Sequence, residues 1–307
     1  MARVNVFGMS ENAEATSPQN KENFIKPSEV KLARRCSLMA GWLYVVTLMV
    51  VVMVVIGGLT RLTNSGLSMV EWRPLTGWLP PFSSDDWMLI FEKYKTSPEY
   101  QKINAGMSLL EFKKIFWLEY IHRLWGRIIG LAFVIPFICF VAFGWVNRRL
   151  TLSLLGLLIL GGLRGGLGWY MVQSGLVDRP DVSQYRLAAH LALALVIIAA
   201  LFWTARGLDR SCRENWEFFD ANSVIGLLRS AYGVLFAVFL TAVSGAFVAG
   251  LDAGLAYNTF PLMDGNWVPE GLLTMTPPFI NFFENTITVQ FDHRVLALST
   301  AALVIAV

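Results

Sequence analysis

The sequence predicts an all-α fold, a polytopic helical bundle that crosses a membrane. Hydrophobic residues fill 55% of the 307 positions and charged residues only 15%, whereas about a quarter of the residues in a soluble domain are charged. The mean hydropathy is +0.53. Several runs also reach roughly 20 residues, the length that crosses a bilayer as a helix. Together these features exclude an ordinary soluble domain.

Five runs are long enough to be complete spans. Four of them carry no charged residue: 38–59, 128–146, 187–205 and 231–251. The remaining run, 150–172, is interrupted only by Arg164. A sixth run begins at Val295 and the sequence ends inside it, at Val307. We therefore expect five complete spans and an unfinished sixth.

Lysine and arginine predict the orientation, because they concentrate in cytoplasmic loops. They flank one side of the first, second and fourth runs: Lys31, Arg34, Arg35, Arg148, Arg149, Arg206, Arg210 and Arg213. We expect residues 1–37 to be a disordered cytoplasmic tail and 207–230 a cytoplasmic linker. The connection 61–118 lies outside, where Ser108 and Glu111 form a capping box that starts a helix. The loop 173–186 also lies outside, although it carries two arginines.

The chain contains only three histidines, and each starts an even-numbered span: His122, His190 and His293. These spans run from outside to inside, so all three imidazoles lie at similar depth near the outer surface. A single such histidine is more often an interfacial residue, but three together favour a shared, inward-facing use. Two imidazoles on neighbouring helices suit haem iron. Zinc is less favoured, because no cysteine or acidic cluster completes a tetrahedron.

Two segments recur in the same order, each leaving an odd-numbered span and entering the next. They are 57–80 with 245–269, and 119–123 with 290–294. Chance similarity of glycine-rich membrane segments is the alternative, and the shared His-Arg pair argues against it. The inferred repeat is four spans long, with both copies in the same orientation. It divides the chain into a first half, 38–206, and the start of a second, 231–307.

Glu119 is the main chemical difference between the copies, because Gln290 takes its place. A carboxylate three residues before a helical histidine lies on the same face. One pocket then has a proton acceptor and the other a neutral amide, which suggests a reaction site paired with an electron-transfer site. An equally weighted alternative is a solvated acid near a helix N-terminus.

The arginines also have two readings each. Arg123 and Arg294 follow the histidines and would bind haem propionates or lipid phosphates. Arg164 must face the bundle interior or extend to the surface. Its neighbouring glycines allow either close helix packing, which we favour, or the approach of a large flat ligand.

Four motifs together resemble one enzyme family. "GGLTRLTNSGLSMVEWRPLTGWLPP", "EYIHRLWGR", "GGLRGGLGWYMVQSGL" and "FDHR" are similar to haem A synthases of the proteobacterial and mitochondrial type. The resemblance runs from about Leu38 to the end of the sequence. It implies oxidation of a methyl group of haem O to a formyl group, through hydroxylated intermediates, in haem A biosynthesis for cytochrome oxidase.

The resemblance also implies roles for single residues. His122 and His190 would ligate the substrate haem, Glu119 would be the catalytic acid, and His293 would bind the iron of a haem b cofactor that transfers electrons. The family has eight spans and a fourth histidine, which this sequence lacks. We therefore expect the second half, with its haem b site, to be incomplete.

The remaining expectations concern location and partners. We expect a multi-pass protein of the bacterial inner membrane, in contact with haem O, membrane lipid, haem O synthase and cytochrome oxidase assembly factors. The electron acceptor is not identified, a homo-oligomer is considered, and no nucleic acid is expected. The main alternative is a diheme b-type electron-transfer cytochrome. A transporter with parallel repeats ranks last, because its polar groups would lie near the midplane.

Overall fold

Six long helices dominate the computed structural model of the chain, which describes residues 27–73, 76–175, 182–211 and 221–307. Each is long and apolar enough to cross a membrane. They are α1 Pro27–Leu62, α4 Leu109–Ala142, α5 Arg148–Gly175, α6 Gln184–Ser211, α7 Ala221–Gly250 and α9 Thr286–Ala306. The short helices α2 Ser84–Lys95, α3 Pro98–Lys102 and α8 Asn281–Glu284 lie in the connections between them. The prediction of an all-α membrane bundle is confirmed.

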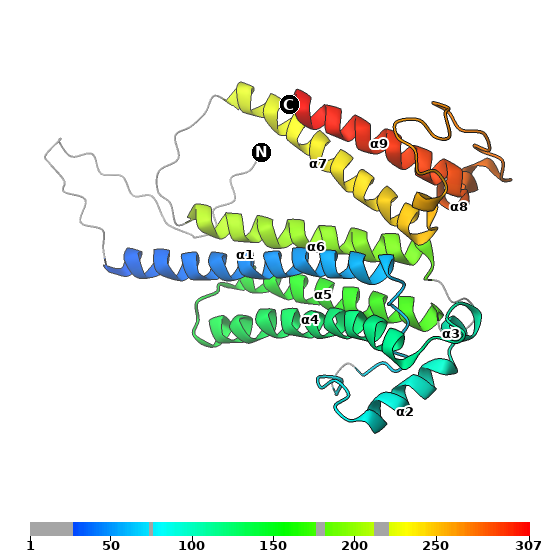
Figure 1. Cartoon of the computed structure of the whole chain (residues 1–307). Coiled ribbons are helices and arrows are strands. Elements are labelled where there is room, and N and C mark those ends of the chain that lie inside the picture. The colour runs from blue at the N-terminus through cyan, green and yellow to red at the C-terminus, as the bar shows by residue number, and fades with distance from the viewer. Residues whose placement is uncertain (1–26, 74–75, 176–181, 212–220) are drawn as a thin grey trace, which may run out of the picture.

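The first four long helices form a closed bundle. Around its circumference α4 contacts α1, α1 contacts α6, α6 contacts α5, and α5 contacts α4. Helices α4 and α6 are therefore diagonally opposite. Helix α7 packs on α6, and α9 packs on α7, so these two form a pair beside the bundle (Figure 1). The α1–α4 and α7–α9 connections lie at the same end of the molecule, here called the loop end (Figure 1).

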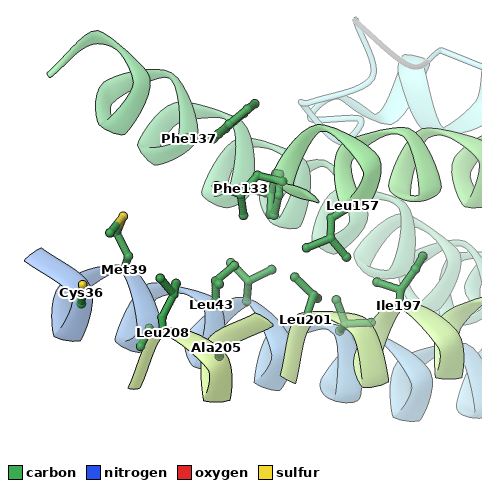
Figure 2. Close-up of a cluster of buried hydrophobic side chains, with 14 residues drawn as sticks. Cys36, Met39, Leu43, Phe133, Phe137, Leu157, Ile197, Leu201, Ala205 and Leu208 are labelled. Atoms are coloured by element: carbon green, nitrogen blue, oxygen red, sulfur yellow. The ribbon is translucent and has the colours of Figure 1, made fainter. Parts of the chain in front are cut away.

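Packed side chains fill the half of the bundle away from the loop end. The cluster draws on all four helices, as Figure 2 shows for Leu43, Phe133, Leu157 and Leu201. On α1 its fully buried members end at Val50. Toward the loop end α1 and α5 carry several glycines among their larger residues. The packed core thus occupies only one end of the bundle.

Aromatic side chains fix the α1–α4 connection against the start of α4. Trp87, Phe91 and Tyr94 of α2 are buried with three aromatic residues of α4, which are Phe112, Phe116 and Tyr120. The predicted capping box is confirmed, because the Ser108 N–H donates to Glu111 Oε2 at 2.8 Å and the Glu111 N–H donates to Ser108 Oγ at 3.3 Å. Helix α4 therefore begins at Leu109 and passes without a break into the span.

Helix boundaries differ from the sequence expectation at two places. Helix α1 begins at Pro27, so the expectation of disorder is wrong for 27–37, where Cys36 joins the buried core. Proline suits the first helical position because its missing N–H has no helical partner there. Helix α6 continues to Ser211 and α7 begins at Ala221, so much of the expected linker 207–230 is helical. Residues 1–26 and 212–220 lie outside the described residues.

Candidate functional site

A cavity of about 760 Å³ occupies the loop-end half of the four-helix bundle. Its size falls within the range of roughly 300 to 1,000 Å³ that ligand pockets span. The lining is mainly apolar, but His122, His190 and Arg164 are part of it. Glycines contribute a large share of the wall: Gly57, Gly58, Gly126, Gly130, Gly161, Gly162, Gly165 and Gly168. These glycines leave room for the cavity on their part of the wall.

The glycines of α5 leave open space. A Cβ atom built on Gly161, Gly162 or Gly165 would meet no neighbouring heavy atom within 4 Å. Our expectation that these glycines serve close helix packing is therefore wrong. The side of α5 that they form faces the cavity, which suits a large flat ligand better.

His122 and His190 enter this cavity from diagonally opposite helices, α4 and α6. Each imidazole lies against a glycine of an adjacent helix. A Cβ atom on Gly57 would lie 3.6 Å from His122 Nε2, and one on Gly168 would lie 3.2 Å from His190 Cε1. A larger residue at either glycine would compete with the ring for space. This arrangement fits a metal-centred macrocycle held between two imidazoles.

His293 has a similar environment in the second half, but it is not part of the lining of the first cavity. A Cβ atom on Gly245 would lie 3.1 Å from His293 Cε1. The Ser244 hydroxyl lies 2.8 Å from His293 Nδ1, so this hydrogen bond holds the ring and leaves Nε2 for a metal. Gly245 also lines the first cavity. One turn of α7 thus contacts both sites.

Glu119 is buried, with only 2% of its surface exposed. Its Oε2 accepts hydrogen bonds from Ser68 Oγ at 2.7 Å and from the Met69 N–H at 2.8 Å, and its Oε1 pairs with Arg123. The alternative of a solvated acid at a helix N-terminus is wrong, because α4 begins at Leu109 and the side chain of Glu119 is buried. Glu119 and Arg123 also line the cavity.

Arg123 and Arg294 anchor the loops that precede their helices. Arg123 Nη1 and Nη2 donate to the Glu71 and Met69 carbonyls at 3.0 and 2.9 Å. Arg294 Nη1 and Nη2 donate to the Thr259 and Tyr257 carbonyls at 2.7 and 2.8 Å. When Gly66 is aligned with Gly254, Met69 corresponds to Tyr257 and Glu71 to Thr259. The two arginines therefore donate to carbonyls at equivalent positions. Propionate binding by either arginine stays a prediction.

The two loops also share backbone geometry. Asn64 and Asp252, at equivalent positions, both adopt left-handed conformations, with φ of 49° and 50°. Such values favour glycine, asparagine and aspartate. At the position of Glu119, Gln290 Nε2 instead donates to the Tyr257 carbonyl at 2.9 Å. The shared loop geometry thus supports the internal repeat. The contacts of Glu119 and Gln290 support a chemical difference between its two copies.

The sequence analysis missed several residues that position the site. Ser68 and Ser244 orient Glu119 and His293, and Gly168 accommodates His190. Gly168 and Ser68 lie within motifs that the sequence analysis quoted, whereas Ser244 precedes the second repeat segment. The two serines contact residues some 50 positions away, at separations of 51 and 49, so no local pattern indicates them.

Residues 40–307 match the family model COX15-CtaA, described as cytochrome oxidase assembly protein. The chain belongs to this family. It is 56% identical over 266 residues to haem A synthase of Nitrosospira multiformis, covering 86% of this chain and 74% of that protein. It is 51% identical over 258 residues to haem A synthase of Nitrosomonas eutropha, covering 84% and 72%.

The similarity extends to eukaryotes. The chain is 47% identical over 269 residues to haem A synthase COX15 of Bos taurus, covering 86% of this chain and 64% of that protein. No solved structure matches the chain. The match with the family model includes all six long helices except the first turns of α1.

Proposed function

We propose that this chain is a haem A synthase that oxidises a methyl group of haem O to a formyl group through hydroxylated intermediates. The observation that carries this proposal is the cavity, rich in glycines, that His122 and His190 both line from diagonally opposite helices. Family membership supports the same activity. The relatives do not favour the alternative of a cytochrome that only carries electrons.

His122 and His190 would hold the substrate through its iron, with the ring plane across the line that joins the two imidazoles. The glycines of α5 give room for the face and edge of the macrocycle. Because the packed core closes the other end of the bundle, the substrate is confined to the loop-end half. The methyl group to be oxidised would lie near Glu119.

Glu119 would accept a proton as the methyl group is oxidised. A carboxylate has about four acceptor positions, and Ser68, Met69 and Arg123 occupy three of those on Glu119. One position on Oε1 stays available to a proton. The three donors fix the direction of the free position. Glu119 is thus proposed as the catalytic acid–base group.

The second half would hold a haem b cofactor that accepts electrons from the first site. His293, which Ser244 holds by a hydrogen bond, would be one of the residues that bind its iron, and Gly245 lies between His293 and the first cavity. We place both sites on the outer side of the bacterial inner membrane, with the N-terminus in the cytoplasm. Haem O synthase and cytochrome oxidase assembly factors are the proposed protein partners.

Extraction and mass analysis of bound haems would test the proposal. The full-length protein, with both four-span halves complete, should yield haem O or haem A together with haem b. His122→Ala and His190→Ala should lose haem O and haem A but retain haem b, whereas His293→Ala should lose haem b. Haem b alone from the unchanged full-length protein, or loss of haem b in His122→Ala, would contradict the assignment.

A further inference from the structure

Four arginines line the cavity, and three of them donate to nearby protein atoms. Arg61 Nε donates to the Ala249 carbonyl at 3.0 Å, Arg123 donates to the Met69 carbonyl, and Arg127 Nη2 donates to the Arg73 carbonyl at 2.7 Å. Arg164 differs from them. Within the described ranges no residue forms a hydrogen bond or an ion pair with its guanidinium, and its Nε is buried.

Arg164 lies too far from either end of α5 for its side chain to extend past the helix. It lies eleven residues before Gly175, the end of the helix, which is about 16 Å at 1.5 Å per residue. An arginine side chain is much shorter than that. Arg164 instead shares the cavity with His122 and His190. A cation this deep in a membrane bundle requires an anionic partner.

The substrate brings such a partner, because a haem carries two propionate carboxylates. A guanidinium matches a carboxylate with two parallel hydrogen bonds. We propose that Arg164 binds one propionate of the substrate haem and thereby fixes the rotation of the macrocycle about the His122–His190 axis. This inference rests on the proposed function for the identity of the substrate. A lipid phosphate is not the partner, because it stays at headgroup depth.

The rotation of the macrocycle determines which methyl group lies near Glu119. Two imidazoles fix the iron and the tilt of the ring plane, but they leave the ring free to turn about the axis through the iron. A third attachment at the ring edge removes that freedom. Arg164 is therefore a specificity-determining residue as well as a binding residue. Its loss should misplace the reacting methyl group even where the haem still binds.

Removing the charges on the ligand tests the pairing directly. The purified chain would be titrated in detergent with ferric protohaem, which has the same two propionates, and with its dimethyl ester, while the Soret band is followed. A His293→Ala background removes the signal of the second site. We expect the chain with Arg164 to bind the diacid about ten- to a hundredfold more tightly than the ester, the range for hydrogen bonds to charged groups.

Arg164→Met should abolish this preference by weakening diacid binding alone. Arg61→Met is the matched control, because it removes a cavity arginine that has protein partners, and it should keep the preference. Arg164→Lys keeps the charge but not the fork, so it should keep part of the preference. It also provides a result if the methionine variant does not fold. Equal preference in Arg164→Met and in the unchanged protein would overturn the inference.

Two further outcomes separate the inference from the proposed function. If both ligands bind with imidazole-ligated spectra but the unchanged protein shows no preference for the diacid, the inference fails and the proposed function stands. If neither ligand produces a spectrum that depends on His122 and His190, the proposed function fails and the inference fails with it.

Discussion

At the scale of single residues, Glu119 has two roles that the structure combines. Its carboxylate lines the cavity, and it also holds the loop through Ser68 and Met69. At the equivalent position of the repeat, Gln290 also contacts its loop, but through a donated hydrogen bond. Anchoring a loop therefore does not require a carboxylate. The carboxyl group at position 119 needs another explanation, and proton transfer provides one.

Glu119→Gln should stall oxidation, so that haem O or its singly hydroxylated form accumulates. The change removes the titratable group, and it also replaces one acceptor oxygen with a donor amide. Ser68→Ala is the control, because it removes one loop contact and keeps the carboxylate. Chromatography of extracted haems should show haem A in Ser68→Ala and almost none in Glu119→Gln. Equal loss in both variants would indicate that Glu119 acts only as a loop anchor.

At the scale of elements, α5 changes function along its length. Leu154 and Leu157 join the packed core, whereas Gly161, Gly165 and Gly168 line the cavity. The glycines weaken the helix intrinsically, because glycine has a low helix propensity. Packing of α5 on α6 and α4 compensates for this, and the missing side chains provide the volume for a ligand.

Gly165→Val should therefore reduce haem binding several-fold while the protein still folds. A valine has space at this position in the structure without a ligand, but its side chain would occupy the cavity. Gly166→Val is the matched control, because Gly166 also has open space around it and is not among the residues that line the cavity. The haem-to-protein absorbance ratio after purification is the measurement. Equal ratios for the two variants would contradict the placement of the ligand against α5.

At the scale of the whole molecule, the three histidines lie in the halves of their helices that are nearer the loop end (Figure 1). His122, His190 and His293 all lie within the first half of their helices, and these helices begin near the loop end (Figure 1). Arg61 strengthens the contact between the halves, because it donates to the Ala249 and Gly250 carbonyls at the end of α7. The two sites are thus held side by side.

Reporter fusions would test the orientation of this assembly. Fusions after Arg149 and Arg210 should report the cytoplasm, because lysine and arginine concentrate on that side. A fusion at Gly265, in the α7–α9 connection, should report the outer side. A cytoplasmic signal at Gly265 would place His293 on the opposite side of the membrane from our proposal.

The sequence by itself determined the membrane class, the helical spans and the three histidines as a group. Hydropathy and charge are summed over many residues, so they need no knowledge of the fold. It also indicated the repeat and the exchange of Glu119 for Gln290, because aligned motifs retain their order. The capping box at Ser108 was predictable because its contacts span three residues.

Only the tertiary structure decided how these residues are used. Whether Gly161 and Gly165 pack against a helix or line a cavity depends on how far away the neighbouring helices lie. The burial of Glu119 depends on a loop that folds back from about fifty residues earlier. Four arginines look alike in the sequence, yet three find carbonyl partners and Arg164 finds none among the described residues. Such differences arise from contacts between segments that are distant in the sequence. Local sequence patterns therefore do not predict them.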